Sequence, residues 1–414
     1  MKQIEIMAPA GNFESLQAAI QAKTDSVYFG VQQLNMRSHG ANNFTLEDLP
    51  KIVEQCEKHK VKTYLTVNSI LYDEDLKLMK KIIDKAKEVD ITAIIACDIA
   101  AIQYANSIGQ EVHTSTQLNV SNIEAVKFFA KFTDVIVLAR ELKLEQIKEI
   151  CDEVKKQKIK GPNGELVKIE IFCHGALCVS ISGKCYMSLA KYNRSANRGE
   201  CYQPCRRAYR VIDEETEDEL KIENKYVMSP ADLCTIQFLD KIIESGVSVL
   251  KIEGRARPPE YVYTVTKVYK EAAQAAQSKT YNDKKINSWI KELETIYNRG
   301  FWHGGYYLGK KLGEWAGVRG SKATIKKTLL GKVEHYFDKK KIAHLNIQNR
   351  ELGAGDELLI TGPTTGVVKT KIKGLYKDGK PSKGKAKGAD ITIPLDKKVR
   401  HNDQVFLLEP KNSR

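Results

Sequence analysis

The sequence predicts a (β/α)8, TIM-like barrel followed by a small all-β barrel, and three observations support this fold class. Eight short apolar runs alternate with amphipathic helical stretches over about the first 255 residues. No G-x-G-x-x-G turn, which an open dinucleotide-binding sheet would normally carry, is present. About 90 C-terminal residues consist of short alternating runs separated by turn clusters, a pattern typical of an all-β module.

The eight predicted strands are fully apolar or nearly so, which indicates a parallel sheet buried on both faces. Eight strand–helix units in about 250 residues fit a closed barrel. The runs are IEIMA (from Ile4), SVYFGV (from Ser26), KTYLTV (from Lys62), TAIIAC (from Thr92), EVHTS (from Glu111), DVIVLA (from Asp134), KIEIF (from Lys168) and SVLKIEG (from Ser248).

Two of the intervening helices carry start signals. Ser121 to Glu124 reads Ser-Asn-Ile-Glu, the pattern of a capping box. Ser229 to Asp232 reads Ser-Pro-Ala-Asp, which supplies a cap, a proline in the first turn and an acid at the third position. These signals predict helices that begin at Ser121 and Ser229.

The seventh and eighth runs begin 80 residues apart, whereas the other runs begin 19 to 36 residues apart. This excursion follows the carboxyl end of the seventh strand, on the face where barrel enzymes place their chemistry. We therefore predict a barrel at 1–277 with a cysteine-rich excursion at 173–234. A helical and aromatic–glycine connector follows at 278–321, and a basic β-barrel at 322–410.

Six of the nine cysteines fall in this excursion. Thiolates are soft ligands for zinc or for iron–sulfur clusters, and four of them complete either kind of site. Only Cys201 and Cys205 approach the paired spacing of structural zinc, and the wide spacing of the others suits a cubane cluster. Buried free thiols are the alternative, and we assign Cys173 to the core. The candidate ligands are Cys178, Cys185, Cys201, Cys205 and Cys234.

The net charge of +14 is concentrated near the C-terminus, because 324–414 holds 20 basic and 10 acidic residues. A concentrated positive field indicates a polyanionic partner, nucleic acid before membrane, although a solvated lysine-rich surface is the alternative. No stretch approaches 18 consecutive apolar residues and no signal peptide is visible. We therefore expect a cytoplasmic protein without a membrane partner.

The segment from Glu170 to Ser188, EIFCHGALCVSISGKCYMS, resembles the signature of the peptidase U32, or collagenase-like protease, family. Further motifs resemble the family in the same order along the chain: Tyr28-Phe-Gly30 with Arg37, Ser115-Thr-Gln117, Ser229-Pro-Ala-Asp-Leu-Cys234, Lys251-Ile-Glu-Gly-Arg255 and Asn298-Arg-Gly300. The basic β tail resembles the family's C-terminal domain. The resemblance thus covers nearly the whole chain.

The resemblance implies a function in RNA modification, because branches of this family hydroxylate tRNA, ribosomal RNA or quinone precursors. The branch most similar to this chain is associated with 5-hydroxyuridine at the tRNA wobble position and is linked to prephenate. The resemblance to the quinone branches, which carry a four-cysteine [4Fe–4S] site, implies a cluster on Cys178, Cys185, Cys201 and Cys234, with Cys205 as the rival of Cys201. Zinc stays the alternative metal. A U32 peptidase and a zinc-containing, non-catalytic RNA-binding protein are the alternative functions.

The candidate catalytic residues are His174, Glu170 and His113. Cys173 and His174 are adjacent on a strand, so they point to opposite faces and cannot form a nucleophile–base pair. Neither H-E-x-x-H nor G-x-S-x-G, the motifs of zinc and serine hydrolases, occurs in the sequence.

The candidate substrate-binding residues follow predicted strands and would open onto the catalytic face. Arginines there can hold a dicarboxylate such as prephenate, or an RNA phosphate, by bidentate hydrogen bonds. A rim ion pair between Glu253 and Arg255 is the structural alternative, and packing is favoured over base stacking for the aromatic stretch 301–307. The basic β module is the candidate for contact with the tRNA backbone. The substrate-binding set is Arg37, Gln117, Arg140, Glu253 and Arg255.

Overall fold

The predicted barrel is present as a closed, eight-stranded parallel sheet in the computed structural model, which describes residues 4–220, 228–310, 314–382 and 384–411. The last barrel strand, β11, pairs in parallel with both β1 and β7 and so closes the sheet. The strands are β1 (Glu5–Pro9), β2 (Ser26–Phe29), β3 (Lys62–Val67), β4 (Ala93–Ala96), β5 (Val112–Thr114), β6 (Val135–Val137), β7 (Lys168–Gly175) and β11 (Val249–Ile252).

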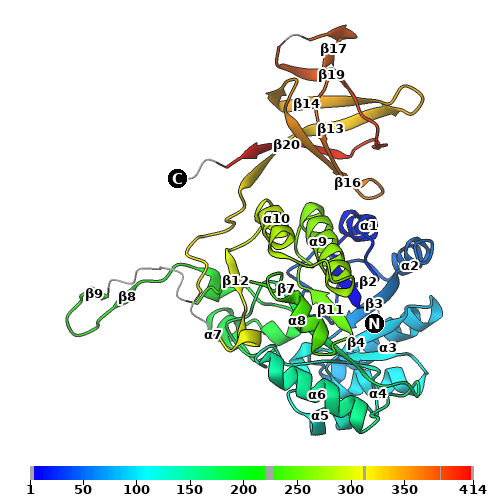
Figure 1. Cartoon of the computed structure of the whole chain (residues 1–414), viewed down its shortest axis with the longest axis vertical. Coiled ribbons are helices and arrows are strands. Elements are labelled where there is room, and N and C mark those ends of the chain that lie inside the picture. The colour runs from blue at the N-terminus through cyan, green and yellow to red at the C-terminus, as the bar shows by residue number, and fades with distance from the viewer. Residues whose placement is uncertain (1–3, 221–227, 311–313, 383, 412–414) are drawn as a thin grey trace.

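Helices surround the barrel and bury their apolar faces against the sheet (Figure 1). Three of them are capped at the N-terminus by an Asn or Asp side chain, namely Asn12, Asp98 and Asn122; the Asn12 side chain accepts from the Ser15 N–H at 2.8 Å. The helices are α1 (Phe13–Gln21), α2 (Leu49–Glu57), α3 (Leu76–Glu88), α4 (Ile99–Ser107), α5 (Ile123–Phe129), α6 (Leu144–Lys156), α8 (Leu239–Glu244) and α9 (Pro259–Gln277).

Both predicted helix starts need correction. The cap of α5 is Asn122 rather than Ser121, because the Asn122 side chain accepts from the Ala125 N–H at 2.9 Å. The Ser229 signal starts no helix at all, since Asp232–Cys234 form a strand, β10. The Asp232 N–H donates to Gly300 O at 2.9 Å. Backbone partners far along the chain therefore override the local capping pattern.

The connector continues the barrel domain. Helix α10 (Asp283–Glu294) packs on α9, and β12 (Phe301–His303) pairs in parallel with β10, which pairs antiparallel with β7. Trp302 and Tyr307 are buried, and the Tyr307 hydroxyl donates to Phe172 O at 2.6 Å. The aromatic–glycine stretch therefore packs against the barrel, as we favoured.

The C-terminal all-β domain is confirmed as an eight-stranded antiparallel sheet with its own apolar core. Among the described residues, its pairing order runs from β16 to β18 without a pairing between these two ends. The strands are β13 (Ile325–Phe337), β14 (Ile342–Leu352), β15 (Glu357–Gly362), β16 (Gly366–Lys371), β17 (Tyr376–Lys377), β18 (Lys380–Pro381), β19 (Ala386–Pro394) and β20 (Gln404–Pro410).

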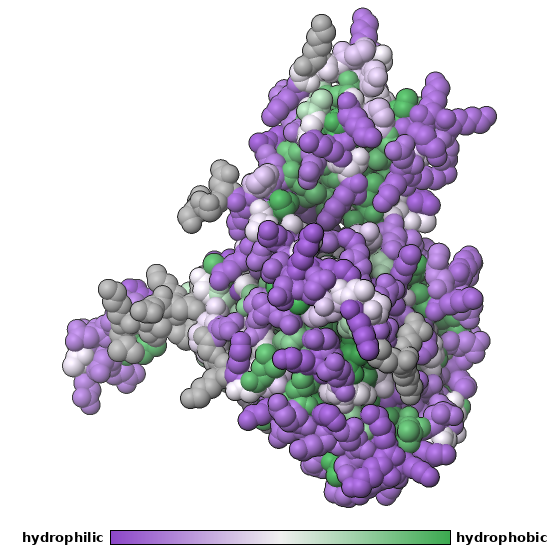
Figure 2. Space-filling view, viewed as in Figure 1, coloured by the Kyte–Doolittle hydropathy of each residue, from purple (hydrophilic) through white to green (hydrophobic). Residues whose placement is uncertain are grey.

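The β domain docks on the helical ring beside α1 and α9 (Figure 1). The Gln21 side chain donates to Thr365 O at 2.6 Å and accepts from the Val367 N–H at 2.9 Å. Lys327 and Glu260 form an ion pair across the same interface at 2.6 Å. Hydrophilic side chains dominate the visible surface of both domains (Figure 2). No helix among the described residues is long and apolar enough to cross a membrane.

Candidate metal centre and substrate pocket

A pocket of about 280 Å³ opens at the carboxyl ends of the barrel strands. Arg37 follows β2, Gln117 follows β5, Arg140 follows β6 and Arg255 follows β11, and all four line this pocket. The other wall comes from the excursion between β7 and β11. The pocket therefore lies on the face where barrel enzymes carry out their chemistry.

Four cysteines of the excursion line this one pocket: Cys178, Cys185, Cys201 and Cys205. Cys178 is exposed and the other three are partly buried. Burial, together with the smaller effect of the other three thiols and partly offset by Arg206, raises the pKa of Cys205 to about 11. The four thiols thus share one electrostatic environment.

The excursion is fixed to the barrel by specific contacts. Arg206 donates to Leu177 O at 2.6 Å and to Pro230 O at 2.7 Å, which ties the loop of Cys205 to the loop of Cys178. Gly199 has a φ of +86°, and a Cβ there would lie 2.0 Å from Ser38 Oγ. This glycine is required because the excursion approaches the loop after β2 so closely.

Cys234 lies elsewhere. It is fully buried on β10, in the main hydrophobic core, and does not line the pocket. Burial raises the pKa of its thiol to about 12. The ligand set implied by the resemblance included Cys234, whereas the structure gathers Cys205 with the other three thiols. Cys173 is buried in the same core, as expected.

The four thiols line one pocket. Among the residues that the structure describes, no three His, Cys, Asp or Glu side chains converge closely enough to hold a single metal ion. A tetrahedral zinc site needs its ligands about 2.3 Å from one ion. A cubane cluster instead takes one thiolate at each of four separate corners. The four thiols are soft donors of the kind that both sites use.

The pocket is strongly cationic. It is lined by seven basic side chains and by one acid, Glu253. Arg37 Nη2 donates to Glu253 Oε1 at 3.1 Å, so the rim ion pair forms with Arg37 and not with Arg255. The Arg37 guanidinium helps hold the pKa of Glu253 below its usual value although burial opposes this. The basic residues are Arg37, Arg140, Arg206, Lys251, Arg255, Arg257 and Arg299.

Four of these arginines, Arg140, Arg206, Arg255 and Arg257, form no ion pair with a carboxylate among the described residues. Arg255 is buried, and its Nη1 donates to Thr66 Oγ1 at 2.8 Å and to Asn35 Oδ1 at 3.1 Å. Burial lowers the pKa of Arg255 to about 10. Arg140 stacks over the Phe172 ring at 4.7 Å, and its buried Nε has no hydrogen-bond partner. Arg140 and Arg255 can therefore bind an anionic ligand.

Gln117 has a largely structural environment. Its amide nitrogen donates to Asn68 O at 2.6 Å, and its amide oxygen accepts from the Ser115 hydroxyl. A Cβ on Gly183 would lie 2.6 Å from Gln117 Cγ, so Gln117 also contacts the excursion. It lines the pocket as predicted, with most of its polar atoms engaged by the chain.

The three candidate catalytic residues do not line the pocket. His174 is buried beside Tyr269, and burial lowers the pKa of its imidazole to about 3. His113 is buried inside the barrel, with Nε2 3.1 Å from Glu111 Oε1. Glu170 is buried below the pocket, and its Oε1 accepts from Lys251 at 2.8 Å. Glu170 is therefore connected to the pocket through its hydrogen bond with Lys251, which lines it.

Lys251, Arg206, Arg257 and Arg299 line the pocket and were not among our candidates. For Lys251 the signal was present in the sequence, since Lys251, Glu253 and Arg255 alternate and so share a strand face. Arg206 and Arg299 carried no such signal, because their positions depend on how the excursion and the connector fold back.

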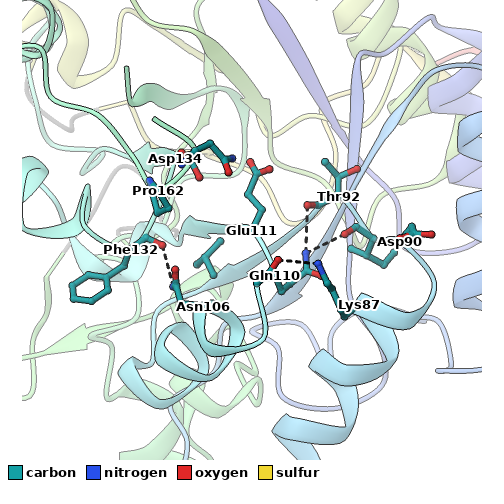
Figure 3. Close-up of a pocket in the computed structure, with 13 residues that line it drawn as sticks. Lys87, Asp90, Thr92, Asn106, Gln110, Glu111, Phe132, Asp134 and Pro162 are labelled. Atoms are coloured by element: carbon teal, nitrogen blue, oxygen red, sulfur yellow. Dashed lines mark hydrogen bonds between the residues drawn. The ribbon is translucent and has the colours of Figure 1, made fainter. Parts of the chain in front are cut away.

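A second cavity, of about 390 Å³, lies at the opposite end of the barrel (Figure 3). Its polar side chains hold the loops that precede the strands: Gln110 donates to Ile91 O at 3.0 Å and Lys87 to Gly109 O at 2.8 Å. Asn106 similarly donates to Phe132 O at 3.1 Å. The amino-terminal face of a barrel mainly serves stability, and these contacts fit that role.

Comparisons with known proteins find a family model and several relatives that match much of the chain. The family model described as peptidase family U32 matches residues 11–317. A collagenase of Porphyromonas gingivalis is 52% identical over 411 residues, covering 99% of each chain. The tRNA hydroxylation protein P1 of Bacillus subtilis is 33% identical and covers 72% of this chain and 69% of its own. The 23S rRNA 5-hydroxycytidine synthase of Escherichia coli is 34% identical and covers 66% of this chain and 40% of its own.

Proposed function

The chain belongs to peptidase family U32, and from this premise we propose that it hydroxylates wobble uridine of tRNA at carbon 5. We further propose that Cys178, Cys185, Cys201 and Cys205 hold a [4Fe–4S] cluster in the pocket at the barrel mouth. The observation that carries the proposal is the meeting of four thiols and seven basic side chains around one pocket.

The reaction requires a redox group. Replacing the C5 hydrogen of uracil by a hydroxyl taken from water would release two protons and two electrons, so the reaction needs an electron acceptor outside the chain. A cluster held by Cys178, Cys185, Cys201 and Cys205 would supply the redox group that passes these electrons on one at a time. The basic side chains that surround the four thiols would balance the negative charge of the thiolates.

The remaining residues support substrate binding. Arg140 and Arg255 can hold a small dicarboxylate, prephenate or a relative, through N–H groups that no carboxylate of the described residues engages. A cavity of about 280 Å³ suits one small ligand or one extruded base and is too small for a folded polypeptide. The lysine-rich β domain would contact the tRNA backbone.

Proteolysis is the second candidate, favoured by the name of the 52%-identical relative. A cysteine peptidase needs a thiolate and a basic imidazole in contact. Burial holds the pKa of Cys173 well above its ordinary value and that of Cys234 at about 12, and the imidazole of His174 is held neutral. No histidine lines the pocket that contains the other thiols. The geometry therefore favours RNA modification.

The test is nucleoside mass spectrometry of tRNA from a strain that lacks this gene. Wild type should restore 5-hydroxyuridine and Cys205→Ala should not, whereas Cys151→Ala, a buried cysteine of α6, should restore it. Unchanged nucleosides in the deletion strain, together with cleavage of denatured collagen that Cys205→Ala abolishes, would overturn the proposal in favour of a peptidase.

A further inference from the structure

We propose that three exposed tyrosines at the mouth of the pocket, Tyr72, Tyr186 and Tyr202, form a platform on which unpaired RNA bases stack beside the reacting nucleotide. The inference rests on the proposed function, because it takes RNA as the partner. Beyond the proposed function, the inference is that the protein recognises an unpaired RNA loop. Aromatic side chains around the pocket, rather than the β domain, would bind the unpaired bases.

Tyr186 and Tyr202 are carried by the same segments as the thiols. Tyr186 lies between Cys185 and Met187, and Tyr202 lies between Cys201 and Gln203; all four neighbours line the pocket. The side chain of Tyr186 is 73% exposed and that of Tyr202 is 52% exposed. The residues on either side of each tyrosine therefore line the pocket, while the tyrosines themselves are exposed to solvent.

Tyr72 belongs to the loop after β3, whose first residue, Asn68, also lines the pocket. Its ring is 54% exposed. The guanidinium of Arg198 lies 3.9 Å from the centre of this ring and is held there by Asp75, at 2.6 Å. Tyr72 and Arg198 thus form a prearranged stack between the barrel loop and the excursion.

The excursion adds a second aromatic and basic group near Tyr202. The rings of Tyr192 and Tyr202 lie 5.6 Å apart, and the guanidinium of Arg207 lies 5.3 Å from the Tyr192 ring. Aromatic faces together with arginine are the combination that binds single-stranded nucleic acid, because every base has a π-face.

The positive charge of the pocket indicates which class of partner binds there. Seven basic side chains against one acid attract a phosphate backbone and do not suit an apolar protein surface. In a duplex the base faces are already stacked on one another, so only an unpaired segment can offer them to tyrosines. A loop nucleotide can enter the pocket at lower cost than a paired one.

The experiment compares anaerobically purified full-length protein binding two RNAs at one salt concentration. The probes are an RNA hairpin with an unpaired pyrimidine-rich loop and a blunt RNA duplex of the same length. Wild type should prefer the hairpin. Tyr72→Ala, Tyr186→Ala and Tyr202→Ala should each weaken hairpin binding about 5- to 100-fold and leave duplex binding unchanged.

Two controls separate stacking from damage to the fold. The corresponding Tyr→Phe variants keep the aromatic face and should retain hairpin binding. Phe128→Ala removes an aromatic side chain of α5 that is 50% exposed and has Lys131 5.8 Å from its ring centre, and it should bind as wild type does.

The outcomes distinguish this inference from the proposed function. Equal hairpin binding by wild type and the three Ala variants would overturn the platform, and if tRNA hydroxylation persisted the function would stand. Loss of binding in the Phe variants would assign the effect to the hydroxyls and would also overturn stacking. A wild-type protein that binds neither RNA would overturn both.

Discussion

Lys251 Nζ lies 2.8 Å from Glu170 Oε1 inside the barrel, where the Lys251 side chain is 6% exposed and that of Glu170 is fully buried. The two residues lie on paired strands, β11 and β7. The ammonium group also lies 4.7 Å from the centre of the Tyr28 ring. This ion pair forms the floor of the pocket and connects the buried carboxylate to the site.

We expect Glu170→Gln to destabilise the protein by about 3–5 kcal/mol, because it leaves a buried ammonium without its counter-charge. Urea unfolding at neutral pH measures this difference. Asp152→Asn, which breaks the exposed pair with Lys148 on α6, is the matched control and should have no measurable effect. Equal unfolding midpoints for Glu170→Gln and wild type would contradict a buried ion pair.

Metal analysis of anaerobically purified protein decides whether Cys205 or Cys234 is a ligand of the proposed cluster. We expect about four irons and four sulfides per chain. Iron and sulfide should both be retained in Cys234→Ala. Both should be lost in the four variants that remove a corner ligand: Cys178→Ala, Cys185→Ala, Cys201→Ala and Cys205→Ala. The reverse result for Cys205 and Cys234 would restore the ligand set that the family resemblance implied. One zinc without sulfide would exclude the cluster.

The barrel could be predicted because each of its strands is specified by a short, continuous stretch of sequence. Each strand is a short apolar run, and a parallel sheet covered by helices requires such runs. The strand at Asp232 could not be predicted from the same information. Its Ser-Pro-Ala-Asp sequence suits a helix start, and the β-partners that override it, such as Phe301, lie about 70 residues further along the chain.

The site was predictable to the extent that it depends on strand ends. Arg37, Gln117, Arg140 and Arg255 follow barrel strands and therefore face the same pocket. His174 and Glu170, two of the candidate catalytic residues, are buried on β7 and do not line the pocket, because a polar residue on a strand can point into the core as well as into the pocket. Burial decides between these positions, and burial depends on tertiary packing.

The neutral, buried imidazole of His174 predicts a loss of stability in acid. Burial, with His303 and Arg257 adding to it, lowers its folded-state pKa from 6.5 to about 3. Between these pH values the unfolded chain binds a proton that the folded chain does not, so the free energy of unfolding falls as the pH falls. From pH 7 to pH 5 this residue should account for about 2 kcal/mol.

Urea unfolding of His174→Gln at pH 7 and pH 5 tests this assignment. The variant should lose less stability on acidification than wild type does. His59→Gln, at an exposed position, should follow wild type. A wild-type-like loss in His174→Gln would mean that other groups cause the acid sensitivity.

The β domain should contribute the salt-dependent part of tRNA affinity. Lys377, Lys380 and Lys387 are exposed on or beside β17, β18 and β19, and none has an ion-pair partner among the described residues. If each contacts a phosphate, the triple Lys→Ala variant should weaken tRNA binding. The slope of log K against log salt should also fall, by about 0.7 to 0.9 for each lost contact.

A second triple variant removes the same charge from another surface. Lys148, Lys155 and Lys156 lie on α6 and pair with Asp152 and Glu153, so they are already partly neutralised. Their replacement by Ala should leave the salt slope nearly unchanged. Equal slopes for both triple variants would mean that net charge alone, rather than the β domain, attracts the RNA. A reduced slope in the first variant alone would locate the phosphate contacts on the β domain, because only a local contact depends on where the charge is removed.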